Sequence, residues 1–336
     1  MQIATYTDVR DHLRAHLSSA ALGAAMELGL FWKLADQPQS ENTIAQNLGI
    51  PLNRCRYWLE ILVQLGLLEK QSELYTVSVV GRAAIIDARS QETWALLAQG
   101  EREYYRVGND LATHMQQSDS TWTLQGLTYP DYVQQMRESP EYARRFTRML
   151  YEIHQSLASE LVAVIDLTGV RNLVDMAGGS GVISLALLRR YLDLTAMVVD
   201  IPNACAAGRE IAAENGLTER IVYHPVDDIL RDELPKGFDA VLVCDTWFQD
   251  EASLTKFAQC LNAGGQFFIA GPIMTVEIAE TLGSAVVDLR GAMHNPDFAR
   301  LTQAQVFENV RRAGLAVEYS QALVKEGLVF IQARKS

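Results

Sequence analysis

The stretch between residues 172 and 190 constrains the fold of this chain more than any other. Asn172–Met176 is a short apolar run that carries Asp175. The segment 177–181 (AGGSG) follows at once, and an apolar helical pattern begins at Val182. Glycines at such a turn let a ligand approach the backbone, and the first turn of the helix offers N–H groups that have no partner within the helix. Strand, glycine turn and helix in this order predict a ligand-binding unit of an open α/β sheet.

Acidic residues end the neighbouring apolar runs. Residues 196–199 are followed by Asp200, which stands about 20 positions after the glycines, where a carboxylate accepts hydrogen bonds from ribose hydroxyls. A third run, 221–225, precedes Asp227 and Asp228. A dinucleotide motif needs glycine where Ser184 stands, and the Gly-Lys-Ser/Thr triplet of a P-loop is absent from the sequence. The pattern therefore predicts a nucleoside site without choosing the nucleotide.

The remaining second half alternates strand and helix patterns. We expect strands at 238–244 and 265–270, and helices at 251–261 and 302–313. The last two apolar runs, 315–323 and 327–334, are separated by a short turn, and strands joined in this way must be antiparallel. The fold class predicted for this half is α/β, with a parallel sheet that finishes in a terminal antiparallel strand.

The first half is mostly helical and has the order of a winged helix. Helical patterns cover 20–34, 40–49 and 51–66, and two β-like runs around a polar turn follow at 67–78. Residues 1–100 hold eight basic and ten acidic side chains, and the whole chain has a net charge of −12. Because phosphate contacts dominate DNA affinity, we expect a dimerising module that binds neither nucleic acid nor an anionic membrane.

Other sequence features bear on membrane insertion, metal binding and cellular location. No apolar run reaches the roughly 18 residues of a membrane span, and residues 1–13 lack the basic and apolar pattern of a signal peptide. Neither a metal-binding spacing nor a paired framework links the four cysteines, so we expect reduced thiols, no metal site and a cytoplasmic location. These cysteines are Cys55, Cys205, Cys244 and Cys260.

Several segments together resemble one family. They are 21–36 (ALGAAMELGLFWKLAD), 43–69 (TIAQNLGIPLNRCRYWLEILVQLGLLE), 174–191 (VDMAGGSGVISLALLRRY), 198–202 (VVDIP) and 261–271 (LNAGGQFFIAG). Over residues 12–334 the chain resembles the S-adenosylmethionine-dependent small-molecule O-methyltransferases. The resemblance implies a winged-helix dimerisation domain at 1–100, a helical linker at 101–168 that contributes to the substrate pocket, and a class I methyltransferase domain with a Rossmann-like sheet at 169–336.

The resemblance also implies roles for individual residues. The glycines of the loop would line the methionine and ribose portions of S-adenosylmethionine, Asp200 would bind the ribose hydroxyls, and Asp175 would hold the loop and the amino group. Asp227 would contact adenine, with Ile201 and Asp228 nearby. The predicted cofactor-binding residues are Asp175, Gly178, Gly179, Gly181, Asp200, Ile201, Asp227 and Asp228.

The sequence departs from the family where a catalytic histidine follows the fourth strand. Residues 244–251 read CDTWFQDE, so Phe248 or Gln249 stands in its place. Either the acceptor needs no base, as for a carbon, amine or thiolate, or another group serves. The catalytic candidates are His294, Asp245 and Gln249, with Asp250 and His154 as further possible bases. The candidates for substrate binding are His154, Met149, Trp247, Phe248 and Arg290.

The predicted function is methyl transfer to a small, aromatic or polyketide-like molecule by a homodimer that forms through the N-terminal domain. O-methylation and C-methylation both stay open because the usual histidine is missing. Two alternatives also stay open. In the first alternative, the chain uses bound S-adenosylmethionine for non-methylating chemistry, such as decarboxylation or cyclisation. In the second, it is a winged-helix regulator.

Overall fold

The computed structural model describes residues 3–336, and the chain separates into two compact units, one up to Met115 and one from Gln116 to Ser336. The division at residues 100 and 168 expected from the sequence stays a prediction, because compactness alone does not distinguish a linker from a domain. Within residues 3–336, no helix has both the length and the apolar character that a bilayer crossing demands.

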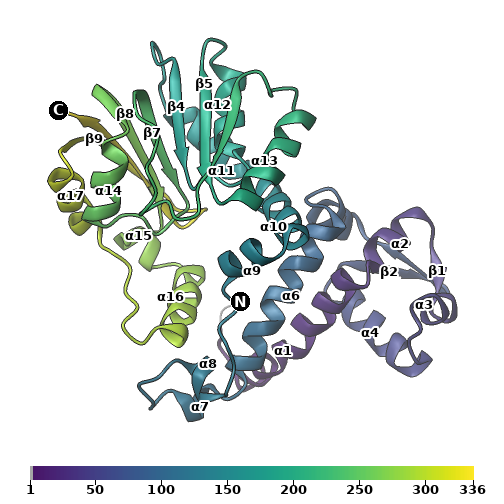
Figure 1. Ribbon diagram of the computed structural model, residues 1–336. Helices are drawn as coiled ribbons and strands as arrows, with labels where there is room; N and C mark the ends of the chain where they lie inside the picture. Colours follow the sequence, from purple (N-terminus) through teal and green to yellow (C-terminus); the bar gives the residue numbers. More distant parts are fainter. Residues whose placement is uncertain (1–2) are drawn as a thin grey trace. The chain divides into compact units, whose positions relative to one another are not determined.

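The first unit is a winged helix flanked by longer helices (Figure 1). Its strands β2 and β3 form the predicted antiparallel hairpin, and β1 pairs with the far edge of β3. Phe31, Leu59, Leu62 and Tyr75 are fully buried in its core. Its elements are α1 Tyr6–Glu27, α2 Leu30–Asp36, β1 Gln39–Ser40, α3 Glu41–Leu48, α4 Leu52–Gln64, β2 Leu68–Gln71, β3 Leu74–Val77, α5 Val79–Gly81, the π-helix η1 Arg82–Ile86, α6 Gln91–Gly108 and α7 Leu111–His114.

One helix predicted in this unit is two helices. The apolar spacing over 20–34 predicts a single segment, but α1 ends at Glu27 and α2 begins at Leu30. Gly29 between them has a φ of 68°, a left-handed conformation that ends a helix and that side chains with a Cβ disfavour. Hydrophobic periodicity continues across such a break, so the pattern alone does not reveal it.

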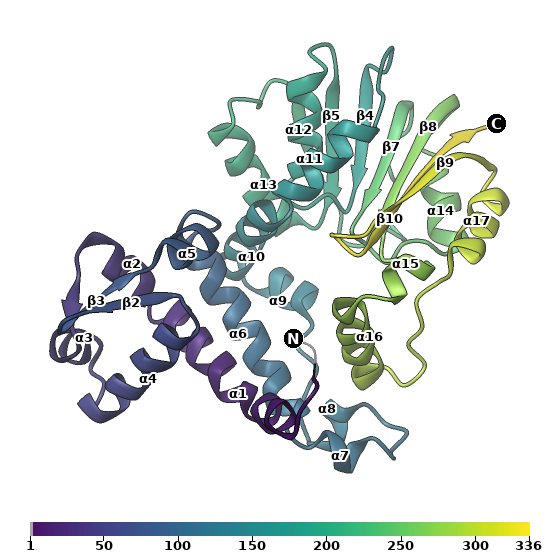
Figure 2. The ribbon, with the colours of Figure 1, turned by 180° about the vertical axis from the view of Figure 1, so that it is seen from behind.

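The second unit is built on a seven-stranded sheet in the order β6-β5-β4-β7-β8-β10-β9 (Figure 2). The neighbours from β6 to β8 are parallel, and β10 is antiparallel to both β8 and β9. The class I methyltransferase sheet predicted from the sequence is confirmed, although the antiparallel strand is last in the chain and not at the edge. The strands are β4 Asn172–Met176, β5 Thr195–Asp200, β6 Ile221–Pro225, β7 Phe238–Cys244, β8 Leu261–Gly271, β9 Leu315–Leu323 and β10 Leu328–Lys335.

Helices cover both faces of this sheet. Along β4, Leu173 joins a core with residues of α11–α13, while Val174 joins the opposite core with residues of α14 and α17. Burial on both faces explains why these strands read as continuous apolar runs. The helices of this unit are α8 Thr121–Leu124, α9 Tyr132–Glu138, α10 Pro140–Ile153, α11 Gln155–Val164, α12 Val182–Arg190, α13 Pro202–Glu214, α14 Glu251–Ala258, α15 Val276–Ala279, α16 Leu282–His294 and α17 Gln303–Arg312.

Candidate active site

Two adjoining cavities lie at the carboxyl ends of β4, β5 and β7, where open α/β sheets bind ligands. The larger has a volume of about 470 Å³ and the smaller about 150 Å³. They share Tyr132 of α9, Leu150 of α10, Ala177 and Gly179 of the glycine loop, and Asp245 after β7. All residues that line these two cavities belong to the second unit.

The glycine loop brings backbone close to these cavities. A Cβ at position 178 would lie 2.5 Å from the Cγ atom of Asp175, so only glycine fits there. Gly181, at the N-cap of α12, has a φ of 72°. Ala177 also has a left-handed backbone, with a φ of 53°, and its N–H donates to the Val199 carbonyl at 2.8 Å. Ala177 therefore carries backbone strain that a glycine at this position would not carry.

We expect Ala177→Gly to stabilise the protein by about 1 kcal/mol, because glycine adopts a positive φ without steric cost. The urea midpoint of unfolding should rise. The control is Ala196→Gly in β5, where the side chain is buried and the strand conformation suits alanine. That control should lower the midpoint. A lower midpoint in Ala177→Gly as well would contradict the assignment of strain.

Asp200 ends β5 and faces the glycine loop. Its Oδ2 atom accepts the Gly179 N–H at 2.8 Å, and its Oδ1 atom accepts the Ile201 N–H at 2.6 Å. Burial raises the pKa of this carboxyl, and the two backbone hydrogen bonds oppose that shift. Because a carboxylate has about four lone-pair sites, acceptor capacity remains for two hydroxyl groups of a ligand.

Asp175 presents an unsatisfied acceptor to the smaller cavity. Its side chain is 1% exposed, and Ser184 donates its hydroxyl to Oδ2 at 2.7 Å. The Oδ1 atom is buried and has no hydrogen-bond partner among residues 3–336. Burial raises the pKa of Asp175 to about 7. A buried acceptor without a donor is costly, so this atom is suited to a cationic or N–H group of a ligand.

His154 and Asp245 form a hydrogen-bonded pair beside the glycine loop. The Nε2 atom of His154 lies 2.9 Å from the Oδ2 atom of Asp245, and both residues line the smaller cavity. The sequence pattern predicts one helix over 141–165, but α10 and α11 meet at His154, which has a φ of −88° and a ψ of 8°. Asp245 has a φ of 48°, and its N–H donates to the Ala270 carbonyl at 2.7 Å.

Most of the predicted site residues line one or both cavities. The residues that do so are Asp175, Gly178, Gly179, Asp200, Ile201, Asp228, His154, Asp245, Trp247 and Phe248. Trp247 is 55% exposed, and Phe248 packs edge-on against Phe257 in the core. Cofactor and acceptor candidates that are far apart in the sequence are therefore brought together.

Seven predicted residues lie outside the lining of the two cavities. They are Gly181, Asp227, Gln249, Asp250, Met149, Arg290 and His294. The carbonyl of Asp227 accepts a hydrogen bond from Arg137 at 2.7 Å. The amide of Gln249 is 3% exposed and donates to the Thr246 carbonyl. His294, at the end of α16, stacks on Tyr129 with the ring centroids 3.5 Å apart.

The sequence analysis expected segment 101–168 to contribute to the pocket, but it did not name the residues of α9 and α10 that line the larger cavity. Tyr132, Val133, Met136 and Arg137 of α9 and Thr147 and Leu150 of α10 line the larger cavity. Burial raises the pKa of the Tyr132 phenol, and the negative charges of Asp245 and Asp200 raise it further. The signal available in the sequence was the four-residue spacing of Phe146, Leu150 and His154, which places these three side chains on one face of a helical pattern.

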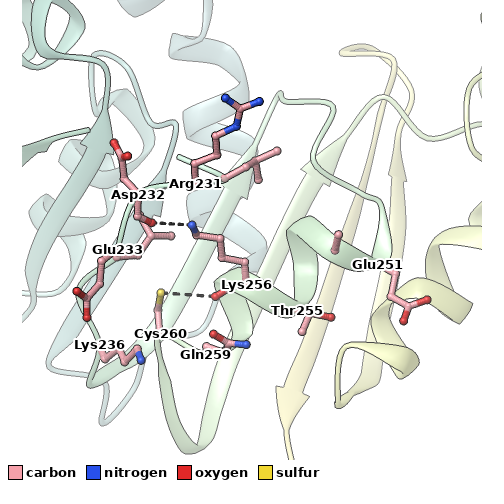
Figure 3. A pocket seen from close by; sticks show the side chains of 12 residues that line it. Arg231, Asp232, Glu233, Lys236, Glu251, Thr255, Lys256, Gln259 and Cys260 are labelled. Atoms are coloured by element: carbon pink, nitrogen blue, oxygen red, sulfur yellow. Dashed lines mark hydrogen bonds between the residues drawn. The ribbon is translucent and has the colours of Figure 1, made fainter. Parts of the chain in front are cut away.

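A third hollow, of about 890 Å³, lies between the loop after β6 and α14 (Figure 3). Long polar side chains surround it, and Lys256 donates from Nζ to the Asp232 carbonyl at 2.6 Å. It is larger than the two cavities, yet no residue of the glycine loop lines it. Nowhere in residues 3–336 do three His, Cys, Asp or Glu side chains gather in a way suited to a metal ion.

Comparison with known proteins places the chain in a family. An O-methyltransferase domain model matches residues 110–314, and an O-methyltransferase dimerisation domain model matches residues 10–85. The 3-hydroxy-5-methyl-1-naphthoate 3-O-methyltransferase of Streptomyces sahachiroi is 32% identical over 74% of this chain and 72% of its own length. The N,N-dimethyltransferase OxyT of Streptomyces rimosus is 26% identical over 92% of this chain and 90% of its own length.

Solved structures share the fold at low identity. The mitomycin 7-O-methyltransferase MmcR has a TM-score of 0.83 at 19% identity and covers 98% of this chain and 97% of its own. Human N-acetylserotonin methyltransferase in complex with SAM has a TM-score of 0.81 at 18% identity and covers 100% of this chain and 99% of its own. Together with the matched models, which span more than half of the sequence, these likenesses show that the chain belongs to the O-methyltransferase family.

Proposed function

We propose that this protein transfers a methyl group from S-adenosylmethionine to a small aromatic or polyketide-like molecule. The observation that carries the proposal is the acidic cradle at the glycine loop, where Asp200 and the unpartnered oxygen of Asp175 flank Gly178 and Gly179. Methyltransferases of aromatic and polyketide compounds are among the relatives that cover most of the chain, which supports the same activity.

The residues present fit this cofactor by charge. Four aspartate side chains and the guanidinium of Arg137 line the two cavities, so acidic groups outnumber basic ones there and the site favours a positively charged ligand. Asp200 would hold the ribose hydroxyls, Asp175 the amino group, and Ile201 and Asp228 the adenine end. When bound, S-adenosylmethionine supplies a methyl group that is electrophilic because it is attached to a positively charged sulfur.

One contribution of the chain to the reaction is to orient the acceptor. Tyr132, Trp247 and Phe248 line the larger cavity with aromatic rings that suit a flat substrate. Holding donor and acceptor in reactive geometry supplies a large share of the rate enhancement in such reactions. Trp247 is more than half exposed while it lines this cavity.

The activity is tested with methyl-labelled S-adenosylmethionine and 3-hydroxy-5-methyl-1-naphthoate together with a panel of phenols and naphthols. Label in an extracted product supports the proposal. Cofactor binding with no label transferred to any acceptor would favour non-methylating chemistry, and no cofactor binding at all would favour the regulator. The named relatives reported above are methyltransferases and lend neither alternative support.

We further propose that the protein works as a homodimer through its N-terminal domain, to which the dimerisation model is matched. Tyr6, Val9, Leu13 and Leu17 follow one side of α1 at helical spacing, and each is 45% exposed or more. Such a stripe is suited to burial against a second copy of the chain. The cytoplasmic location expected from the sequence stays a prediction.

A double substitution, Leu13→Asp with Leu17→Asp, is expected to convert the dimer to monomer, because it places two charges in an apolar interface. Light scattering coupled to size exclusion measures the mass directly. His12→Asp adds a charge to the same helix away from the stripe and should leave the dimer intact. If the double variant keeps the dimer mass, the interface lies elsewhere.

A further inference from the structure

We infer that His154 is the general base of this enzyme, that Asp245 positions it, and that the acceptor is an aromatic hydroxyl group. The inference rests on the proposed function and narrows it from an open choice of acceptor atom to O-methylation. It assigns to the junction of α10 and α11 the role that the family gives to a histidine after the fourth strand, where this chain has Phe248 or Gln249.

The backbone around His154 is fixed by hydrogen bonds on both sides. Its N–H donates to the Leu150 carbonyl at 3.1 Å, and its carbonyl accepts the Ala158 N–H at 2.8 Å. The imidazole is 20% exposed and lines the cavity together with Gly178 and Gly179 of the glycine loop. The side chain is therefore held at the place where the cofactor's methionine end is proposed to bind.

Asp245 determines which nitrogen of His154 can act. An ionised carboxylate only accepts hydrogen bonds, so the Nε2 atom carries the proton and donates it to Asp245 at 2.9 Å. The Nδ1 atom then has a free lone pair, and no hydrogen bond to it is found within residues 3–336. Orientation of a histidine by a carboxylate is the arrangement that prepares an imidazole to take a proton.

The backbone at Asp245 supports a functional reading of the pair. Asp245 has a left-handed φ of 48°, a conformation that few residues other than glycine, asparagine and aspartate adopt, and left-handed residues cluster at active sites. The N–H of Asp245 is tied to the Ala270 carbonyl of β8, so the strained turn is held by the sheet. The other titratable side chains that line this cavity are Tyr132, Asp175 and Cys244.

A hydroxyl oxygen is a weak nucleophile until it loses its proton. In the proposed step the acceptor's O–H bond breaks, its electron pair stays on oxygen, and the proton bonds to the Nδ1 atom of His154. The carboxylate of Asp245 stabilises the imidazolium that results. The imidazole of His154 is 20% exposed, so the proton can return from it to solvent after each turnover.

The test compares His154→Ala, His154→Gln and Asp245→Asn with wild type, using labelled S-adenosylmethionine and 3-hydroxy-5-methyl-1-naphthoate, with a phenol and naphthol panel beside it. Both His154 variants should lower kcat/KM at least 100-fold at pH 7 and lose the acid limb of the pH profile. Asp245→Asn should lower kcat/KM about tenfold. The matched control is Gln155→Ala. Gln155 is the exposed residue that follows His154, and its substitution should change kcat/KM less than threefold.

A second readout separates this role from cofactor binding and from folding. Titration calorimetry should give a Kd for S-adenosylmethionine within threefold of wild type in both His154 variants. A Kd weakened tenfold with kcat intact at saturation would make His154 a cofactor ligand and overturn the inference. A loss of kcat/KM below threefold would overturn it too.

Methylation of the phenol and naphthol panel by the wild-type protein, together with its cofactor binding, gives two further outcomes. If wild type binds the cofactor but methylates no phenol or naphthol in the panel, the assignment of a hydroxyl acceptor is wrong while the cofactor site stands. If wild type fails to bind S-adenosylmethionine, the proposed function itself fails.

Discussion

An Asp200→Ala variant will bind S-adenosylmethionine about 100-fold more weakly than the wild-type chain. The carboxylate lies at the end of β5, where its free lone pairs are placed to accept two ribose hydroxyls. Hydrogen bonds to a charged group contribute about 1.5–3 kcal/mol each, and about 1.4 kcal/mol corresponds to a tenfold change in Kd. Loss of both therefore predicts about two orders of magnitude, which titration calorimetry can measure.

Two further variants make this result interpretable. Asp200 also accepts the N–H groups of Gly179 and Ile201, so its removal can loosen the loop as well as the ligand. Asp200→Asn keeps the size of the side chain and tests the charge. Asp193→Ala removes an exposed carboxylate between α12 and β5 and should leave Kd unchanged. Equal affinity in Asp200→Ala and wild type would refute the assignment of the cofactor site.

The second large effect is a pH dependence of cofactor binding that originates at Asp175. Burial raises the pKa of this carboxyl to about 7, so near neutral pH a part of the protein carries it protonated. Only the ionised form attracts the cationic amino group of S-adenosylmethionine. The association constant should therefore rise as the pH increases from 6 to 7, by up to about tenfold per pH unit, and should level off above the pKa.

Asp175→Asn isolates this effect, because asparagine cannot titrate. The variant should bind less tightly than wild type at pH 7.5 and should lose the rise in affinity below that pH. Titration of the cofactor itself is common to both proteins, so the difference between their two curves reports Asp175 alone. Parallel curves for the two proteins would show that Asp175 does not face the cofactor.

The parts of the fold that local patterns encode were predicted well. The strand, glycine turn and helix from 172 to 190 form as expected, because their apolar spacing and their glycines act over a few residues. The hairpin at β2 and β3 is confirmed for the same reason. The helix breaks at Gly29 and His154 were missed, since apolar periodicity continues through both positions.

The candidate site was predicted most directly around the glycine loop, where sequence patterns carry several of its residues. Asp175, Gly178, Gly179 and Asp200 lie together because neighbouring parallel strands end at one edge of the sheet. Residues from other elements carry no such signal. His154 and Asp245, which form a hydrogen-bonded pair at the site, are 91 positions apart, and each was a candidate without the other.

The predicted base role of His294 illustrates the same limit. It was placed by resemblance of its segment to the substrate pocket of the family, yet its ring stacks on Tyr129 and lines neither cavity. Aromatic stacking of this kind depends on how α16 meets the loop after α8, a contact between segments more than 160 positions apart. Hydrophobic spacing does not encode such a contact.

The most direct test of the whole account is a crystal structure of the chain with S-adenosylhomocysteine. It should show the ribose hydroxyls on Asp200, the amino group beside Asp175, and the sulfur facing the cavity that His154 lines. Two results would contradict the claim that residues 177–181 form the cofactor site. One is density for the nucleoside at any other place, and the other is a cavity beside the glycine loop that is filled by side chains of the protein.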